Sequence, residues 1–555
     1  MVHQAEATLA PNESDTSMWK RPGLLLALAV FAWHVAHTNF LIDDAFISFR
    51  YAANWADGLG LAFNPGEAPV EGYSNFLWVA LLSVARTLGC ELEIASRVLS
   101  IGASVVLVLL LHRSLVARGF SRTATTLGTL ALVTFPPFAT WATGGLETAL
   151  FALLFFVAFD ALIAPPATRR SLVPLLIAGL ALPLVRTDGL AFIAVLAITT
   201  ALVRSHGSQR RLPPFVAAAL LSATAYGIWR YTHYGLWVAN TVRVKAGFSS
   251  ELLLRGVNTS ASYLLVLGSP LLALAGVIWL RASPARACTR HYCLAATLGF
   301  AAFLAYNTLI GGDWMPMFRM LAPASPLLAI VIAGLVDRAG KVGGIAIGSL
   351  AIGVAILPSF DLSVASAGVR ERLAFRSFKT GYQSERARWQ RGVDNLTNFT
   401  QIGKGLAQVA PEDASFTAGA IGAIGYYSGL QILDRNGLVE PSVATLRASP
   451  ESRSAGHDKR VPRAFFLDRS PTYFEAVISP QRIPGPNSPA FSQAASYIGR
   501  LVLTEPGEAI LRDHCLPQAH ALQPEPGLPE GCSLLVLRAT EDSERARQAW
   551  ERIGL

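Results

Sequence analysis

Two adjacent carboxylates, Asp43 and Asp44, directly follow an apolar run in the stretch LIDDAFISFR. A carboxylate at the edge of a membrane is partly desolvated, which raises its pKa toward that of a general base, while a substrate can still reach it from water. Two neighbouring acids repel each other, so a nearby cation such as Arg50 would be needed to keep both charged. The alternative is structural: Asp44 caps a helix that continues through AFISFRYAANWA, where its charge favours the positive end of the helix dipole.

Other charged and polar residues recur beside apolar runs. In WATGGLETALFALL, Glu147 stands at a helix entrance with Thr143 as a candidate N-cap, and LVRTDGLAF sets Arg186 and Asp188 between two apolar runs. A guanidinium binds phosphate with parallel hydrogen bonds, so Arg186 suits a phosphate as well as an ion pair at a turn. The candidate substrate-binding residues are Arg50, Glu71, Glu147, Arg186, Asp188, Asn240, Arg243, Lys245, Asp313 and Arg319.

The elements that hold these residues must be membrane helices. Of the 555 residues, 52% are hydrophobic and 15% are charged, and the mean hydropathy is +0.41, whereas soluble proteins carry roughly a quarter charged residues. Apolar runs near the ~20 residues that span a bilayer recur as far as about residue 357 and then stop. We predict an N-terminal tail over 1–21, a transmembrane domain over 22–358 and a soluble domain over 359–555. The expected spans, about eleven, are 22–40, 95–112, 124–141, 147–164, 172–185, 189–203, 213–230, 257–280, 292–310, 320–336 and 342–358.

The basic loops predict which ends of these spans face the cytoplasm. With the N-terminal tail inside, the loops 113–123, 165–171, 204–212, 281–291 and 337–341 are cytoplasmic, and each carries Arg or Lys, as the positive-inside rule requires. The run SNFLWVALLSVA at 74–85 would invert this pattern if it crossed the bilayer. Because it is short, we predict an interfacial or re-entrant helix within an outer loop over 41–94. The candidate residues then lie in or beside outer loops, on the extracytoplasmic side.

The segment 359–555 is predicted to be an α/β domain. ASFTAGAIGAIGYYSGLQILDRN indicates a strand, a helix start and a strand, and RAFFLDRSPTYFEAVIS indicates a helix followed by a strand. GAIGAIG lacks the GxGxxG frame, so its small residues indicate close packing. If this domain lies outside the cytoplasm, Cys515 and Cys532 can form a disulfide, and the sequence leaves that pairing open.

Several function classes are excluded or disfavoured. The net charge of +9 does not indicate nucleic-acid binding, because Arg and Lys gather in short loops between apolar runs. The sequence contains no P-loop, no GxGxxG that enters a helix, no HExxH and no GxSxG. Ionisable residues are nearly absent from the middle of the spans, since Asp160 and His34 lie near span ends, and this disfavours an ion-coupled transporter.

A resemblance to a known family rests on the stretches DDAFISFRYAANWADGLGLAFNPGEAPVEGYSNFLW, TGGLETALFALL, RTDGLAF, YGLWVANTVRVKAG and GGDWMPMFRMLAP. They resemble the bacterial membrane glycosyltransferases of the GT-C class, and within it the mycobacterial terminal β-(1→2) arabinofuranosyltransferases. AIGAIGYYSGLQILDRNGLVEPSVA and GHDKRVP extend the resemblance into the C-terminal segment. It implies a polyprenyl-phosphate sugar donor, with arabinofuranose as the sugar, and transfer to an envelope glycan or glycolipid on the periplasmic side of a bacterial inner membrane. In this family an acid of the first outer loop is the catalytic carboxylate, which here is Asp43 or Asp44.

The side and charge of Arg186, Arg243, Lys245 and Arg319, rather than the resemblance, make them candidates for binding the donor phosphate, and a mechanism follows as a hypothesis. Asp43 or Asp44 removes a proton from an acceptor hydroxyl as that oxygen attacks the anomeric carbon, and the outer cations stabilise the departing phosphate. A divalent ion on the acidic pair would assist as a Lewis acid, but the sequence offers no further ligands, so we predict no metal site and no cofactor. A flippase or transporter of lipid-linked saccharides is the alternative function, and a non-catalytic scaffold is a third.

Overall fold

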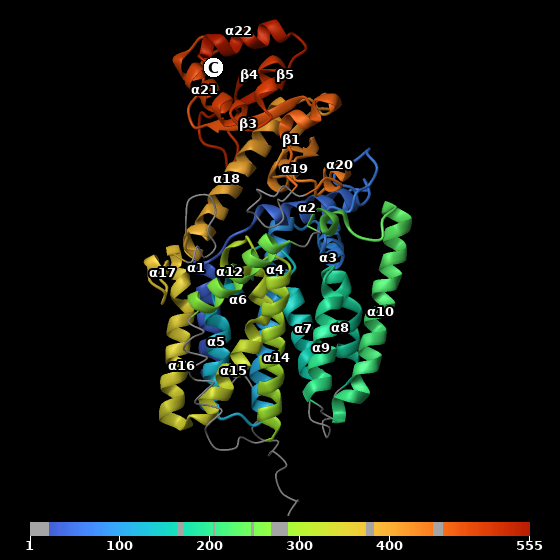
Figure 1. The fold of residues 1–555 in the computed structure, drawn as a ribbon, viewed down its shortest axis with the longest axis vertical. Coiled ribbons are helices and arrows are strands. Elements are labelled where there is room, and N and C mark those ends of the chain that lie inside the picture. Colours follow the sequence, from blue (N-terminus) through green and yellow to red (C-terminus); the bar gives the residue numbers. More distant parts are fainter. Residues whose placement is uncertain are drawn as a thin grey trace, which may run out of the picture.

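The computed structural model describes residues 22–163, 171–203, 206–245, 249–267, 287–372, 382–447 and 459–555. A bundle of long helices carries a smaller domain with a β-sheet at one end (Figure 1). The predicted fold class, a polytopic helical protein with a C-terminal α/β domain, is confirmed. The predicted N-terminal tail, 1–21, lies outside the described residues, and the domain limits at 22, 358 and 359 remain predictions.

The bundle helices coincide with the predicted apolar runs. In the described residues they are α1 (Pro22–His37), α4 (Leu92–Ala117), α5 (Arg122–Thr134), α7 (Thr148–Leu162), α8 (Val173–Val185), α9 (Gly189–Val203), α10 (His206–Tyr234), α12 (Ser250–Val266), α14 (Ala287–Leu309), α15 (Ser325–Arg338) and α16 (Gly340–Ile356). Within the same ranges, five helical stretches are long and apolar enough to cross a membrane: Leu92–Ala117, Gln209–Tyr234, Thr289–Leu309, Pro316–Arg338 and Gly340–Phe360. The predicted number of spans therefore remains a prediction, and the end of the span 257–280 lies outside the described residues.

Prolines set helix ends that the apolar runs did not locate. The predicted span 124–141 is divided, because α5 ends at Thr134 and a short helix, α6 (Pro136–Thr140), begins at Pro136. A proline disfavours a helical conformation of the residue before it, and Phe135 is accordingly extended. The predicted span 320–336 begins instead as a 3-10 segment, η3 (Pro316–Ala324), before α15 starts at Ser325.

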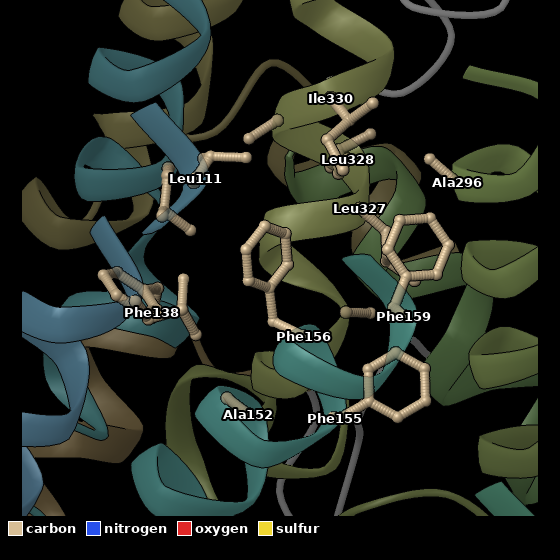
Figure 2. Packing of buried hydrophobic residues seen from close by; sticks show 14 of the residues in the cluster. Leu111, Phe138, Ala152, Phe155, Phe156, Phe159, Ala296, Leu327, Leu328 and Ile330 are labelled. Atoms are coloured by element: carbon tan, nitrogen blue, oxygen red, sulfur yellow. The ribbon is translucent and has the colours of Figure 1, made fainter. Parts of the chain in front are cut away.

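The core of the bundle is formed by large apolar side chains. Phe155, Phe156 and Phe159 of α7 belong to one cluster with Leu111 of α4 and Leu327 of α15, and all five are fully buried (Figure 2). Because they are spaced by one and four residues, the three phenylalanines cover one wide face of the helix. This packing fixes the direction in which α7 leaves its first turn, where Glu147 lies.

The loops predicted to be outside gather at the end of the bundle that carries the C-terminal domain, called the outer end below. Helices α2 (Asp43–Ala56) and α3 (Phe76–Thr87) lie there (Figure 1). In the basic loops at the opposite end, the Ser121 N–H donates to Asp337 Oδ1 at 2.9 Å. The described basic loop 113–123 thus lies beside the C-terminal end of α15, away from the outer end, as the positive-inside pattern predicts, and the assignment of the outer end to the periplasm remains a prediction.

Helix α3 does not cross the bundle. Asn75, just before it, donates to Glu147, and Glu93, just beyond it, accepts a hydrogen bond from Tyr427 of the C-terminal domain. Both ends of α3 therefore lie at the outer end. Its 12 residues extend ~18 Å, which is less than the ~30 Å of the hydrocarbon layer. This agrees with the interfacial or re-entrant helix predicted for 74–85.

The C-terminal domain contains a mixed sheet with the order β2-β1-β3-β5-β4. Strand β1 (Ser415–Ala418) is parallel to β2 (Gln431–Asp434) and β3 (Tyr473–Ser479), and β5 (Ser533–Ala539) is antiparallel to β3 and to β4 (Cys515–Ala521). The predicted strand, helix start and strand are β1, α19 (Gly422–Ser428) and β2, so this prediction is confirmed. The remaining longer helices are α18 (Glu385–Val409), α21 (Pro489–Leu503) and α22 (Ser543–Ile553).

The cysteines of this domain are not bonded to each other. Cys515 and Cys532 are both free and buried. Cys515 pairs with Ala539 at one end of the β4–β5 hairpin, whereas Cys532 precedes the Ala521–Ser533 pair at the other end. Six strand residues separate these ends by ~20 Å, far beyond the reach of a disulfide. The disulfide considered from the sequence is therefore excluded in this fold.

One hydrophobic cluster joins the two domains. Phe46 and Phe49 of α2 pack with Ile424 of α19 and Phe416 of β1, and all four are buried. Each such side chain stabilises the packed state by about 1.5–3 kcal/mol when it is removed from water. The sheet domain is therefore fixed directly on α2, the helix that begins with the two acids.

Candidate functional site

The two acids occupy the first turn of α2 without capping it. The helix begins at Asp43, its N-cap is Ile42, and no side chain caps it. The expectation that Asp44 caps this helix is therefore wrong: the chain is extended at Ile42, so Asp43 and Asp44 are the first and second residues of the helix. Both carboxylates still lie at the positive end of the helix dipole. Adjacent helical residues point ~100° apart, so the two side chains face different surroundings.

Asp43 binds the C-terminal domain. Its Oδ1 accepts from the Ala423 N–H at 2.8 Å and its Oδ2 from the Gly422 N–H at 3.2 Å. These are the first N–H groups of α19, which a carboxylate satisfies well. Burial, together with repulsion from Asp44, raises the pKa of Asp43 to about 7 despite these bonds. Asp43 thus holds the helix start of another domain, 379 residues further along the chain.

Arg50 holds the other end of α19. Its guanidinium donates to the carbonyls of Phe63 (2.6 Å), Gly425 (2.6 Å) and Leu430 (2.7 Å). The residue is almost completely buried, and burial lowers its pKa to about 10. The expectation that Arg50 neutralises the acidic pair or binds substrate is not supported. Its guanidinium donates to backbone carbonyls, and it lies about two helical turns along α2 from the two acids.

Glycines allow this close approach of α2 and α19. A Cβ on Gly422 would lie 1.9 Å from the backbone oxygen of Asp43, and one on Gly425 would lie 2.7 Å from an Arg50 nitrogen. Neither distance is compatible with a side chain at these positions. The interpretation of GAIGAIG as a close-packing segment is therefore confirmed.

Asp44 faces a polar network within the bundle. Its half-buried carboxylate has no hydrogen-bond or ion-pair partner in the described residues. One turn further along α2, Ser48 and Asn75 are hydrogen-bonded to each other, and Asn75 Nδ2 donates to Glu147 Oε2 at 2.9 Å. Residues four apart on a helix lie on the same face about 6 Å from each other. Asp44 is therefore about one helical turn from this network.

Glu147 is the centre of the network. Its carboxylate is 2% exposed and receives Arg319 Nη2 at 2.7 Å and Arg186 Nη1 at 3.4 Å. Arg186 also binds Asp188 with two parallel hydrogen bonds of 2.8 and 2.7 Å, and Tyr306 donates to the same carboxylate. Although burial opposes it, the Arg186 guanidinium lowers the pKa of Asp188. The sequence-derived candidates Glu147, Arg186, Asp188 and Arg319 are thus brought together in a single cluster.

Arg319 keeps unused donors within this cluster. Besides Glu147, it donates to Thr148 Oγ1 at 3.2 Å and to the Met315 sulfur at 3.5 Å, a weak acceptor. A guanidinium has five N–H groups. The three contacts that Arg319 makes with described residues therefore leave two N–H groups for a ligand. Thr148 is the first residue of α7, whose N-cap is Glu147; Thr143, the expected N-cap, instead bonds Phe40 and Thr140.

The segment before Arg319 has a strained backbone. Met317 and Phe318 have positive φ values of 52° and 51°, and for non-glycine residues this costs of order 1–3 kcal/mol each. Asp313 supports the segment, because its carboxylate accepts from the N–H groups of Met315 and Met320, both at 2.9 Å. Asp313 is therefore a support for the Arg319 segment.

The remaining candidates lie apart from the cluster. Glu71 accepts from Arg230 at 2.5 Å and from Tyr226 at 2.7 Å, and burial raises its pKa. Asn240 donates to the carbonyls of Gly437 and Leu438 in the C-terminal domain. Arg243 follows in α11 (Asn240–Lys245), and only the backbone of Lys245 is described.

Comparison with solved structures finds the same architecture elsewhere. The crystal structure of ArnT from Cupriavidus metallidurans bound to undecaprenyl phosphate aligns with a TM-score of 0.51 and 14% identity, over 94% of this chain and 98% of that chain. The fold is that of the GT-C glycosyltransferases. Two further crystal structures have lower scores: apo ArnT from the same organism (0.48, 15% identity, 76% and 86% covered) and an apo oligosaccharyltransferase from Archaeoglobus fulgidus (0.43, 13%, 97% and 78%).

Two comparisons concern the sequence. A family model described as a domain of unknown function, DUF8728, matches residues 383–516, within the C-terminal domain. No curated protein matches the chain. The GT-C fold is therefore shown by structural similarity, and the arabinofuranosyl specificity implied by the resemblance remains a prediction.

Several residues of this candidate site were not identified from the sequence. Asn75 lies at the start of an apolar run, where it is typical of a helix end, and Tyr306 lies inside a mainly apolar helix, where a tyrosine is ordinary. Glu385 and Arg388 belong to the C-terminal domain, and only the fold brings them to the outer end. Within the described ranges, no three His, Cys, Asp or Glu side chains gather in a group that could hold a metal ion.

The arrangement brings three functional groups to one end of the bundle. Asp44 is a carboxylate with open acceptor sites, Arg319 is a cation with open donors, and Glu147 is a buried anion that fixes the cation. A proton acceptor and an anion-binding group at the same end of the bundle suit transfer chemistry in which an acidic leaving group departs.

Proposed function

We propose that this protein is a membrane glycosyltransferase that transfers a sugar from a polyprenyl-phosphate donor to an envelope glycan or glycolipid. The observation that carries the proposal is that Asp44 lies about one helical turn from Ser48, which is linked through Asn75 to the Glu147–Arg186–Arg319 cluster, at the end of a GT-C fold where the helix bundle meets the C-terminal domain. ArnT, which shares this fold, was crystallised with undecaprenyl phosphate, and this supports a lipid-linked donor here.

Asp44 is the proposed base. It removes the proton from an acceptor hydroxyl while that oxygen forms a bond to the anomeric carbon, and the bond from that carbon to the phosphate oxygen breaks. Asp43 fits this role less well, because both of its carboxylate oxygens accept N–H groups of α19. The choice between the two acids, which the sequence left open, therefore falls on Asp44.

Arg319 is the proposed partner of the departing phosphate. Its two unused donors can bind an anion, and the partial negative charge that develops on the leaving oxygen is stabilised by a cation held in advance. Arg186 acts with it, although two of its bonds are held by Asp188. The charges of Arg186 and Arg319 are balanced by those of Glu147 and Asp188, so the phosphate binds the unused N–H groups of Arg319 while Glu147 weakens the attraction.

The finer parts of the proposal follow the family resemblance. Arabinofuranose is the proposed sugar, the periplasm is the proposed side, and no cofactor is proposed. These rest on the outer-loop motifs and on the separation of basic and candidate loops to opposite ends of the bundle.

Purified full-length protein provides the test. Mass spectrometry of co-purifying lipid should identify a polyprenyl phosphate or its glycosylated form, and incubation with that donor and an envelope glycan should extend the glycan by one sugar. A protein that neither carries nor uses such a lipid, while remaining folded in detergent, is not the enzyme proposed. Movement of intact lipid-linked saccharide across proteoliposomes without transfer would favour the flippase instead.

A further inference from the structure

We propose that Glu385 and Arg388, on helix α18 of the C-terminal domain, are positioning residues that hold the Arg319 segment in the conformation that binds the donor phosphate. The inference rests on the proposed function, in which Arg319 contacts that phosphate. It assigns the soluble domain a part in donor binding. The catalytic chemistry itself remains with the residues at the outer end of the bundle.

The Arg319 segment requires support from outside itself. Met317 and Phe318, directly before Arg319, are both in the left-handed region, at φ 52° and 51°. Non-glycine residues persist there only where the surroundings determine the conformation. The side chains of both residues are buried, so the segment cannot relax by exposing them without losing apolar packing.

Helix α18 provides that support on two sides of Pro316. The Met317 N–H donates to Glu385 Oε2 at 2.7 Å, and the Arg388 guanidinium donates to the carbonyl of Trp314. Glu385 is 2% exposed and Arg388 is 7% exposed. These two side chains are one turn apart on α18, so one helical face of the C-terminal domain binds the segment through its backbone.

The bundle holds the same segment from below. The indole N–H of Trp141 donates to the Pro316 carbonyl at 3.1 Å, and Asp313 binds the backbone N–H groups of Met315 and Met320. The strained turn is therefore fixed between the two domains. Movement of α18 away from the bundle would break the hydrogen bond to the Met317 N–H, two residues before Arg319.

Binding of undecaprenyl phosphate to the purified full-length protein tests the inference. Glu385→Ala should weaken binding about tenfold, comparable with the loss of one charge-assisted hydrogen bond to the phosphate, and Arg319→Ala should weaken it by a similar factor. Glu385→Gln should bind as the wild type does, because its amide oxygen still accepts from Met317. The matched control is Glu93→Ala, which removes a different hydrogen bond between the bundle and the C-terminal domain, the one from Tyr427, and should leave binding unchanged.

The double variant distinguishes positioning from a general loss of structure. If Glu385 acts through Arg319, Glu385→Ala in an Arg319→Ala background should cause no further loss. Independent losses that multiply, or normal binding by Glu385→Ala, would overturn the inference while leaving the proposed function intact. A wild type that does not bind undecaprenyl phosphate would refute the proposed function and this inference with it. Should Glu385→Ala not fold, Glu385→Asp, whose carboxylate is one methylene shorter, provides the same comparison.

Discussion

Replacing Glu147 with Gln should lower stability and raise phosphate affinity at once. The substitution keeps the shape of the side chain and removes a buried charge that lies 2.7 Å from Arg319 and 3.4 Å from Arg186. At an effective dielectric constant of about 20, these separations correspond to attractions of about 6 and about 5 kcal/mol. Desolvation offsets most of this, and removing one partner of a buried pair costs about 3–5 kcal/mol. Arg186 keeps both bonds to Asp188, so we expect a loss of about 3 kcal/mol.

The same substitution frees Arg319 from its carboxylate. An additional charge-assisted hydrogen bond to phosphate contributes about 1.5–3 kcal/mol, so the affinity for undecaprenyl phosphate should rise about tenfold. Thermal unfolding in detergent, with and without undecaprenyl phosphate, measures both effects: the midpoint falls without the lipid, and the lipid raises it more than in the wild type.

Glu71→Gln is the matched control for this experiment. Glu71 is equally buried and lies at the same end of the bundle, but it is paired with Arg230 rather than with the cluster. It should lower the midpoint of unfolding and leave the affinity for undecaprenyl phosphate unchanged. An unchanged midpoint for Glu147→Gln, or a weakened affinity, would refute the reasoning about the cluster.

Three further results are expected. Gly422→Ala should lower the thermal midpoint through overpacking of about 1–3 kcal/mol, because its Cβ would lie 1.9 Å from the backbone oxygen of Asp43. The control is Gly392→Ala on α18, where a Cβ meets no other atom and the midpoint should not fall. Equal midpoints for the two variants would contradict the close packing of α2 and α19. The pKa of Asp43 is about 7 in the folded protein and ~3.9 in an unfolded chain, so the folded protein holds more protons in this window and stability falls as the pH rises through it. Asp43→Asn should therefore show a shallower decline of the midpoint between pH 5 and 8, and an unaltered slope would argue against the titration of Asp43. Because Cys515 and Cys532 are free, a reductant should leave the midpoint unchanged, and a decrease would indicate a disulfide.

The sequence predicted more of the fold than of the candidate site. Apolar runs record which segments are buried in a bilayer or a bundle, so most helices fall where the runs do. The divided span at Phe135 and Pro136 differs because a proline effect acts on one residue, whereas a hydropathy window averages over many. The basic loop 113–123 lies away from the outer end, as its charge predicts, because the charge pattern of the loops reflects a property of the whole membrane domain.

The roles of the acids and of Arg50 depended on contacts that the sequence does not encode locally. Asp43 and Asp44 are chemically identical neighbours, and only the arrival of Gly422, 379 residues away, distinguishes them. Arginine is a common ligand-binding residue, yet Arg50 donates its hydrogen bonds to backbone carbonyls of the C-terminal domain. By contrast, Arg186 and Asp188 are two residues apart, so their pairing was foreseeable, while their link to Glu147 and Arg319 required the packing of α7 against η3.

Sugar transfer by Asp44→Asn, compared with Asp43→Asn, tests the central claim most directly. With purified protein, polyprenyl-phosphate sugar and acceptor glycan, Asp44→Asn should lower kcat by about 10²–10⁴-fold, the usual contribution of a general base, while binding of undecaprenyl phosphate remains normal. Asp43→Asn should keep kcat within about tenfold of the wild type, because it removes a domain contact and not the base. Full activity in Asp44→Asn, or a greater loss in a folded Asp43→Asn than in Asp44→Asn, would contradict the assignment of Asp44 as the catalytic carboxylate.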